Sequence, residues 1–256
     1  MKDFRKKPQR PKKSSLVYGR TAIVTALKEG AGLDRIYIDQ KANDPAIGEI
    51  RRLAATRNVP LNYVPKAKLD FFNVGEHEGV IAQKSRIVYQ ELQDVISFVT
   101  ETGAVPLFLI LDGITDIRNI GGIARTAWCC GVHAIIIPDK GVGALNEDAI
   151  LTSAGALEEI PVCRVNSLMK TVDELHLNGI RVFAAAMEGA KKVSEADLTI
   201  PTAIVMGSEE KGIYPALLKI CDENIRIAMK NDFESLNVSV ATGMILYEAM
   251  EQRSRG

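Results

Sequence analysis

From Leu107 onward, short segments that are almost continuously apolar alternate with stretches of helical pattern, and this alternation constrains the fold most strongly. The strand-like segments are residues 107–111, 134–137, 161–165, 181–186, 203–206 and 224–227, with helical patterns at 122–130 and 167–177 among the segments between them. Strands that are apolar on both faces indicate a parallel sheet covered by helices on both sides. We therefore predict an α/β domain over residues 106–254, with its ligands at the carboxyl ends of the strands.

The residues before this domain form a second, smaller pattern of helices and strands. Helical patterns cover residues 18–28 and 46–57, and extended patterns cover 35–39, 61–64 and part of 80–88. A unit of this size lies in the normal range for a domain. We predict a small α/β domain over residues 16–90, joined to the larger one by a helix or linker over 91–105.

The N-terminal residues carry a concentration of positive charge. Residues 1–13 hold seven Lys or Arg against one Asp, although the formal net charge of the chain is zero. We predict a disordered basic arm over residues 1–15, which either binds nucleic-acid phosphates or only improves solubility. Neither an export signal nor an apolar run of about 20 residues is visible, so we expect a cytoplasmic protein without a membrane segment.

Cysteine and histidine spacing gives no sign of a metal site. The four cysteines form no CxxC pair, and the three histidines lie far apart in the sequence. Zinc sites need such ligands at close and regular spacing. We expect no metal, and we expect Cys129 and Cys130 to be buried structural thiols within a helix.

Three loops that follow predicted strands carry more glycine and polar side chains than an ordinary connection needs. In the first, residues 111–127, Asn119 is placed to cap the following helix, and Arg125 follows two turns later. A capped helix with a solvated arginine is the alternative.

The second loop is Met206-Gly-Ser-Glu-Glu-Lys-Gly212, in which Glu209 and Glu210 suit hydroxyls, amines or a cationic partner. A plain strand-to-helix turn remains the alternative here.

The third loop, residues 233–243, presents Ser235, Asn237 and Ser239 at alternate positions before a helix. One cap needs fewer hydrogen-bonding groups, so we favour a site over a capping cluster. No GxGxxG follows a strand, the second loop lacks the Gly-Lys-Ser/Thr of a P-loop, and no GxSxG is present. The spacing alone predicts an α/β enzyme with a small-molecule site near these loops.

Taken together and in this order, the three loops resemble the motifs of the SpoU family of RNA ribose methyltransferases, within the knotted SPOUT class. The resemblance covers residues 106–253, with Asn119-Ile-Gly and Arg125 in the first motif, 207–212 in the second and 235–243 in the third. Residues 16–88, including Tyr18-Gly-Arg and His77-Glu-Gly-Val-Ile-Ala82, are similar to the substrate-binding domain of such enzymes, a fold related to ribosomal RNA-binding proteins.

The resemblance implies a deep trefoil knot formed by the second and third motif loops, in which family members bind S-adenosylmethionine. It also implies a homodimer that acts on RNA. The matching cofactor positions are Gly207, Ile227 and Leu236. The principal catalytic role falls to Arg125, and the supporting residues that the motifs imply are Asn119, Glu209, Ser235 and Asn237.

Arg125 is an awkward general base, because a free guanidinium has a pKa of roughly 12.5 to 13.8. Our hypothesis is that it anchors a substrate phosphate and stabilises the developing alkoxide, while phosphate or solvent takes the proton. Resemblance favours a guanosine of large-subunit (23S) ribosomal RNA as the target. The alternatives are a guanosine in the D-loop of transfer RNA, or a catalytically silent RNA-binding protein that assists ribosome assembly.

Overall fold

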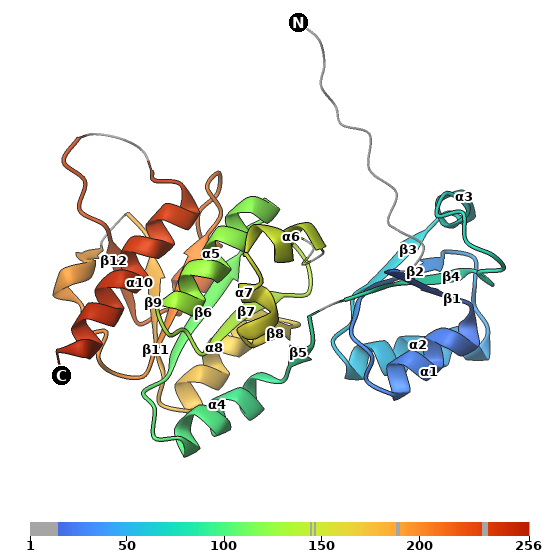
Figure 1. Cartoon of the computed structure of the whole chain (residues 1–256), viewed down its shortest axis with the longest axis horizontal. Helices are drawn as coiled ribbons and strands as arrows, with labels where there is room; N and C mark the ends of the chain where they lie inside the picture. The colour runs from blue at the N-terminus through green and yellow to red at the C-terminus, as the bar shows by residue number, and fades with distance from the viewer. Residues whose placement is uncertain are drawn as a thin grey trace, which may run out of the picture. The chain divides into compact units, whose positions relative to one another are not determined.

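A computed structural model describes residues 15–85, 87–143, 145, 147–187, 190–231 and 235–255 of the chain (Figure 1). It divides into two compact units, and the division follows Ser85. The basic arm predicted over residues 1–15 lies outside the described residues except for Ser15. Within the described ranges, no helix is both long and apolar enough to cross a bilayer.

The first unit is a four-stranded sheet with helices on both faces. Its strands are β1 (Leu16–Tyr18), β2 (Leu33–Asp39), β3 (Leu61–Val64) and β4 (Val80–Lys84), and its helices are α1 (Arg20–Lys28), α2 (Pro45–Thr56) and α3 (Lys66–Asp70). The strand order is β1-β4-β2-β3, in which β2 and β3 are parallel and the other pairs are antiparallel. Ile23 of α1 and Ile50 of α2 pack on one face, and Leu69 of α3 packs on the other. The predicted small α/β domain is thus confirmed.

The second unit is built on an eight-stranded sheet. Its strands are β5 (Tyr89–Gln90), β6 (Leu107–Asp112), β7 (Ala134–Pro138), β8 (Val162–Val165), β9 (Arg181–Ala185), β10 (Lys191–Lys192), β11 (Thr202–Gly207) and β12 (Glu223–Arg226). The order is β10-β12-β9-β11-β6-β7-β8-β5, and all of these pairs are parallel. The predicted parallel α/β sheet is confirmed. β11 is inserted between β6 and β9, although both precede it in the chain.

Helices cover both faces of this sheet (Figure 1). They are α4 (Leu92–Glu101), α5 (Ile117–Cys129), α6 (Glu147–Thr152), α7 (Ala156–Glu159), α8 (Leu168–Leu177), α9 (Pro215–Leu218) and α10 (Val238–Ser254), together with the short 3-10 helix η2 (Val193–Glu195). The cluster of buried residues that includes α5, α6, α7 and α10 lies on one face. The cluster that includes α4, α8 and α9 lies on the other.

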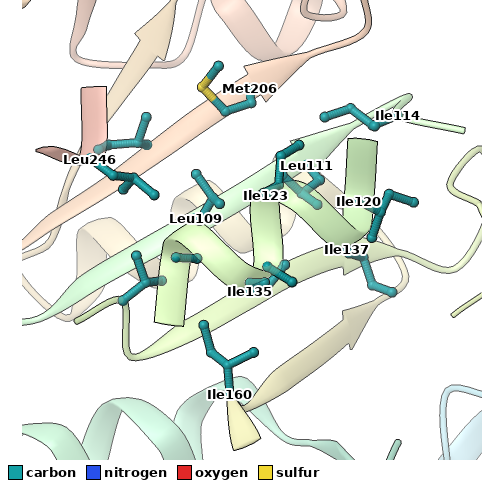
Figure 2. Packing of buried hydrophobic residues seen from close by; sticks show 14 of the residues in the cluster. Leu109, Leu111, Ile114, Ile120, Ile123, Ile135, Ile137, Ile160, Met206 and Leu246 are labelled. Carbon is teal, nitrogen blue, oxygen red and sulfur yellow. The ribbon is translucent and has the colours of Figure 1, made fainter. Parts of the chain in front are cut away.

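The apolar runs of the sequence are explained by the two covered faces. Along β6, Leu109 and Leu111 belong to the cluster under α5 and α10, while Ile110 belongs to the cluster under α4 and α8. Figure 2 shows the first cluster, in which Leu109 and Leu111 lie near Ile123 of α5. Successive side chains of a strand point to opposite faces, so a strand covered on both sides needs apolar residues at every position.

The boundary between the units differs from the predicted one. Tyr89 and Gln90, expected at the end of the small domain, form β5 and pair with β8 in the larger sheet. Residues 91–105, expected as a helix or linker, contain α4, whose Val95 and Val99 are buried in the same cluster as Phe108. These residues therefore contribute core to the second unit.

The expectation for the paired cysteines was wrong for one of them. Cys129 is exposed and Cys130 is half-buried, whereas Cys163 in β8 is fully buried. The buried face of α5 is formed by Ile120, Ile123 and Ala127, which leaves Cys129 on the outer face of the helix.

Candidate functional site

A cavity of about 380 Å³ opens at the carboxyl ends of β9, β11 and β12, where a ligand site was predicted. Most of its lining is apolar, and the polar side chains that reach it come mainly from the second and third motif loops. We call it the first cavity. Its lining residues are Ala185, Ala186, Met187, Met206, Gly207, Ser208, Glu209, Lys211, Gly212, Ile213, Leu218, Ile225, Arg226, Ile227, Met229, Ser235, Leu236, Val238, Ala241 and Ile245.

The second motif loop is folded back on itself beside this cavity. The backbone N–H of Gly212 donates to the carbonyl of Ser208 at 2.9 Å, and the N–H of Ser208 donates to the carbonyl of Gly212 at 3.2 Å. A Cβ at Gly207 would stand 2.2 Å from the carbonyl carbon of Gly212, closer than any real contact. Gly212 itself has a φ of +65°, which glycine adopts readily. Glycine at 207 and 212 thus allows the two backbone segments to lie in contact.

A hydrogen-bonded cluster joins all three motif loops at the carboxylate of Glu209. The Oε1 atom of Glu209 accepts from the side-chain amide of Asn237 at 2.5 Å and from that of Asn119 at 3.3 Å. It also accepts from the backbone N–H of Val238 at 3.2 Å. The amide of Asn237 further donates to Oδ1 of Asn119 at 3.1 Å. One carboxylate oxygen of Glu209 therefore connects three segments that are distant in sequence.

The position of Asn119 in α5 differs from the prediction. Asn119 does not cap α5; the N-cap is Asp116, whose carboxylate accepts from the backbone N–H of Arg118 at 2.9 Å. The side-chain hydrogen bond from Arg118 lowers the pKa of Asp116. Because Asp116 satisfies the helix terminus, the Asn119 side chain is free to reach the other loops. Capping of this kind is typical of Asp.

Asn237 has two roles at the start of α10. Its Oδ1 accepts from the backbone N–H groups of Ser239 and Val240 at 3.0 and 3.3 Å, and from the Ser239 hydroxyl at 2.6 Å. The other end of the same amide donates to Glu209 and Asn119. One side chain thus caps the helix and holds the cluster together.

The structure brings most of the predicted site residues together. Gly207, Ile227 and Leu236, predicted to bind the cofactor, all line the first cavity, as do Glu209 and Ser235. Asn119 and Asn237 meet Glu209 at the edge of that cavity. The predicted residues therefore form one region, apart from Arg125.

Arg125 is exposed on α5 and does not line the first cavity. Among the residues that the structure describes, it makes no hydrogen bond or ion pair. Exposed apolar side chains also lie on α5 and α10, of which Trp128, Met244 and Tyr247 are each about half exposed. Arg125 is thus available to a phosphate or to a partner.

Sequence reasoning missed several residues that line the cavities. Met187 and Met229 follow β9 and β12 without any recognisable motif, and only their place after strands could have identified them. Asp112 ends β6 and accepts from the backbone N–H of Tyr214 at 2.6 Å, which ties the first motif loop to the second.

A second cavity, of about 650 Å³, lies beside the first. Ser208, Glu209, Lys211, Gly212 and Val238 line both cavities, so the second motif loop forms the partition between them. Its other lining residues come from the end of β6 and the following loop, the start of α5, the loop after β7, the second motif loop and the start of α9. They are Asp112, Gly113, Ile114, Thr115, Asp116, Asn119, Gly141, Glu210, Tyr214 and Pro215.

Two family models match the chain in the positions of its two units. Residues 106–247 match the model described as the SpoU rRNA Methylase family, and residues 16–89 match the model described as RNA 2'-O ribose methyltransferase substrate binding. All three motif loops lie within the first match.

Similar proteins extend over almost the whole chain. The putative TrmH family tRNA/rRNA methyltransferase YacO of Bacillus subtilis is 34% identical over 93% of this chain and 96% of its own length. The 23S rRNA (guanosine-2'-O-)-methyltransferase RlmB of Pseudomonas aeruginosa is also 34% identical, with the same coverage of both chains. The solved structure of the SpoU methyltransferase AviRb from Streptomyces viridochromogenes in complex with AdoMet is 24% identical, covers 94% of this chain and 91% of that one, and has a TM-score of 0.60.

Proposed function

We propose that this chain, which belongs to the SpoU rRNA methylase family, transfers a methyl group from S-adenosylmethionine to a ribose 2′-hydroxyl of RNA. The observation that carries the proposal is the junction of Asn119, Glu209 and Asn237 at the rim of the first cavity. It places oriented polar groups next to a small-molecule cavity, which is what an enzyme needs to position a hydroxyl group for transfer.

The first cavity suits S-adenosylmethionine by its size and its lining. Met206, Ile225 and Leu236 offer apolar surface to an adenine ring and an aliphatic chain, and Gly207 lines the same cavity. Glu209 adds a negative charge at the rim, which favours a cationic ligand. Gly207, Ile227 and Leu236 would hold the cofactor. When bound, it supplies a methyl group activated by a positively charged sulfur.

The protein's own residues perform the remaining work. The reaction forms a bond between the ribose oxygen and the methyl carbon and breaks the bond between that carbon and sulfur; the hydroxyl proton passes to a substrate phosphate or to solvent. Asn119, Glu209, Ser235 and Asn237 orient the reacting groups. Arg125 binds the neighbouring phosphate and stabilises negative charge on the oxygen, since a guanidinium forms paired hydrogen bonds with phosphate.

The proposed target is a guanosine of large-subunit ribosomal RNA. The relative from Pseudomonas aeruginosa carries that activity in its name, and residues 16–89 match a model for RNA substrate binding. Transfer RNA is the second candidate, because the relative from Bacillus subtilis is described as a tRNA/rRNA methyltransferase. A catalytically silent RNA-binding protein is less favoured, because Asn119, Glu209 and Asn237 remain in mutual contact.

We also propose that two copies form a homodimer through the outer face of α5 and α10. Val240, Met244 and Tyr247 lie one helical turn apart on one side of α10, and each is about half exposed. Trp128 adds apolar surface from α5. Contiguous exposed apolar groups of this kind mark interaction surfaces. Arg125 is also exposed on α5, so pairing through these helices would place it near the partner subunit.

A trefoil knot through the second and third motif loops is part of the same proposal. The strand order supports it, because β11 enters the sheet between β6 and β9, which are both earlier in the chain.

Methyl transfer and binding test the proposal separately. Calorimetry with S-adenosylmethionine measures binding, and transfer of its labelled methyl group to RNA from a strain lacking the gene measures activity. Arg125→Lys should keep cofactor affinity and lower the transfer rate by roughly 100-fold, because lysine lacks the planar fork. Arg255→Lys, at an exposed arginine beyond α10, is the control. Absence of cofactor binding would show that the chain is not a methyltransferase, and near-normal transfer by Arg125→Lys would remove its catalytic role.

A further inference from the structure

The second cavity is large enough for a ligand, and the predicted cofactor positions Gly207, Ile227 and Leu236 do not line it. At about 650 Å³ it falls in the range of roughly 300 to 1,000 Å³ that is usual for ligand sites. It shares the second motif loop with the first cavity, so its contents lie directly across that loop from the cofactor site. A substrate group held there would have its attached ribose near the partition.

Four carboxylates line this cavity, and three of them already have partners. Asp112 accepts from the Tyr214 backbone, Asp116 is paired with Arg118 at 2.8 Å, and Glu209 is held by Asn119 and Asn237. Glu210 is exposed and, among the residues that the structure describes, makes no hydrogen bond or ion pair. It is therefore the carboxylate that is available to a ligand.

An aromatic ring stands at the edge of the same cavity. Tyr214 lines it and is 63% exposed as a residue. Its backbone is fixed by the bond to Asp112 at one side, and by Pro215 at the first position of α9 on the other. Exposed aromatic rings on fixed backbone are common stacking platforms for unpaired bases in RNA-binding proteins.

We propose that the second cavity binds the base of the target nucleotide, that Tyr214 stacks on it, and that Glu210 selects guanine by accepting hydrogen bonds from N1–H and the N2 amino group. This inference rests on the proposed RNA methyltransferase function and names the residues that choose its substrate. A carboxylate accepts hydrogen bonds and, when ionised, donates none. Guanine presents two adjacent donors on its Watson–Crick edge, whereas the other three bases each present an acceptor beside any donor there.

The test uses the full-length protein, S-adenosylmethionine and RNA from a strain lacking the gene, with mass spectrometry of the methylated nucleosides. The wild-type protein should form 2′-O-methylguanosine. Glu210→Gln should lower kcat/KM for this product by roughly 10- to 100-fold, as expected for loss of a paired base contact. Tyr214→Ala should also lower it, and Tyr214→Phe should retain activity because the ring is kept. Glu101→Gln, at the end of α4, is the matched control.

A second arm replaces the mapped guanosine by inosine, which lacks the N2 amino group, in a synthetic RNA of the same sequence. The wild-type protein should discriminate against inosine, and Glu210→Gln should lose most of that discrimination while its affinity for S-adenosylmethionine is unchanged. Methylation of a pyrimidine or of adenosine, or an unaltered preference in Glu210→Gln, would overturn the assignment. If no RNA is methylated although the protein is folded, the proposed function itself fails, which is a different result.

Discussion

The side-chain amide of Asn237 donates to Oδ1 of Asn119 at 3.1 Å, across 118 positions of the sequence, and donates to Glu209 from the same nitrogen. This contact can be separated from helix capping by choice of substitution. Asn237→Ser should still cap α10, because serine caps about as well as asparagine. It removes the amide, so methyl transfer should fall by roughly 10-fold or more while the free energy of unfolding changes by less than about 1 kcal/mol.

Asn237→Ala is the companion variant. It removes both the cap and the amide, so it should lower the free energy of unfolding by about 1 kcal/mol more than Asn237→Ser does. Urea titrations of both variants, with transfer assays on the same samples, give the comparison. Equal activity of wild-type protein and Asn237→Ser would mean that the cluster at Glu209 does not serve the reaction.

Arg253 anchors the end of α10, and its loss should be costly. Its guanidinium donates to the carbonyls of Leu198, Val105, Pro106 and Ile200 at 2.7–2.9 Å. Arg253→Ala should lower the free energy of unfolding by about 2–4 kcal/mol, because several partly buried acceptors lose a charged donor. Arg255→Ala should change it by less than about 0.5 kcal/mol, since Arg255 forms only an exposed pair with Glu251. Similar values for the two variants in urea unfolding would contradict this assignment.

Gly207→Ala tests the contact between the backbone segments of the second motif loop. The added Cβ would meet the Gly212 carbonyl carbon at 2.2 Å, so the loop must shift and the first cavity must change shape. We expect at least about a 10-fold loss of affinity for S-adenosylmethionine and a stability loss of about 1–3 kcal/mol. Gly48→Ala in α2 is the control, because open space surrounds that position; it should stabilise by up to about 1 kcal/mol. Unchanged calorimetric affinity in Gly207→Ala would show that the loop tolerates displacement.

His133 should make the unfolding free energy depend on pH. Burial lowers the pKa of His133, with a further contribution from the charge of Arg253. Its Nδ1 accepts from the backbone N–H of Leu107 at 3.1 Å, as a neutral ring can. The folded state therefore binds fewer protons than the unfolded state, in which the histidine pKa is about 6.5.

The direction of the pH dependence follows from this difference in bound protons between the folded and unfolded states. The contribution of His133 is fully present above about pH 6.5 and is lost as the pH falls through the unfolded and then the folded pKa. The urea concentration at the unfolding midpoint of the wild-type protein should decrease as the pH is lowered from about 8 to about 5.5. His133→Gln should make this decrease smaller. A slope equal to that of the wild-type protein would assign the dependence to other groups.

The alkylation rates of the cysteines test both the burial of Cys163 and the proposed dimer. Burial raises the pKa of Cys163 to about 12, so this thiol should resist alkylation by iodoacetamide until the protein unfolds. Cys129 is exposed on α5 and should react in the folded monomer. Because Cys129 lies on the helix proposed to pair, its reaction should slow as protein concentration rises. A rate independent of concentration, measured by mass spectrometry, would argue against pairing through this face.

The strands of the larger sheet could be predicted because burial on both faces forces apolar residues at each position. Residues 107–111 are the best example, and the structure places them in β6 at the centre of the sheet. Short elements carry too few residues to show a period. β1 was missed for this reason, and β5 was assigned to the wrong unit.

The site could be predicted as three loops but not as a network. Asn119 was expected to cap α5 because asparagine at such a position often does so, yet Asp116 stands nearer the helix start and takes that role. The contacts of Asn119 with Glu209 and Asn237 depend on strand order, which local patterns do not contain. The second cavity depends likewise on how the loops after β6 and β11 face each other.

Helix α10 contributes both to the stability of the fold and to the wall of the first cavity. α10 supplies Asn237 at its start and the four-carbonyl anchor of Arg253 at its end. During synthesis on a ribosome, every strand of the sheet emerges before this helix does. A nascent chain can therefore assemble its sheet while the wall of the first cavity is still missing. The first cavity therefore lacks Val238, Ala241 and Ile245 until the first turns of α10 have emerged.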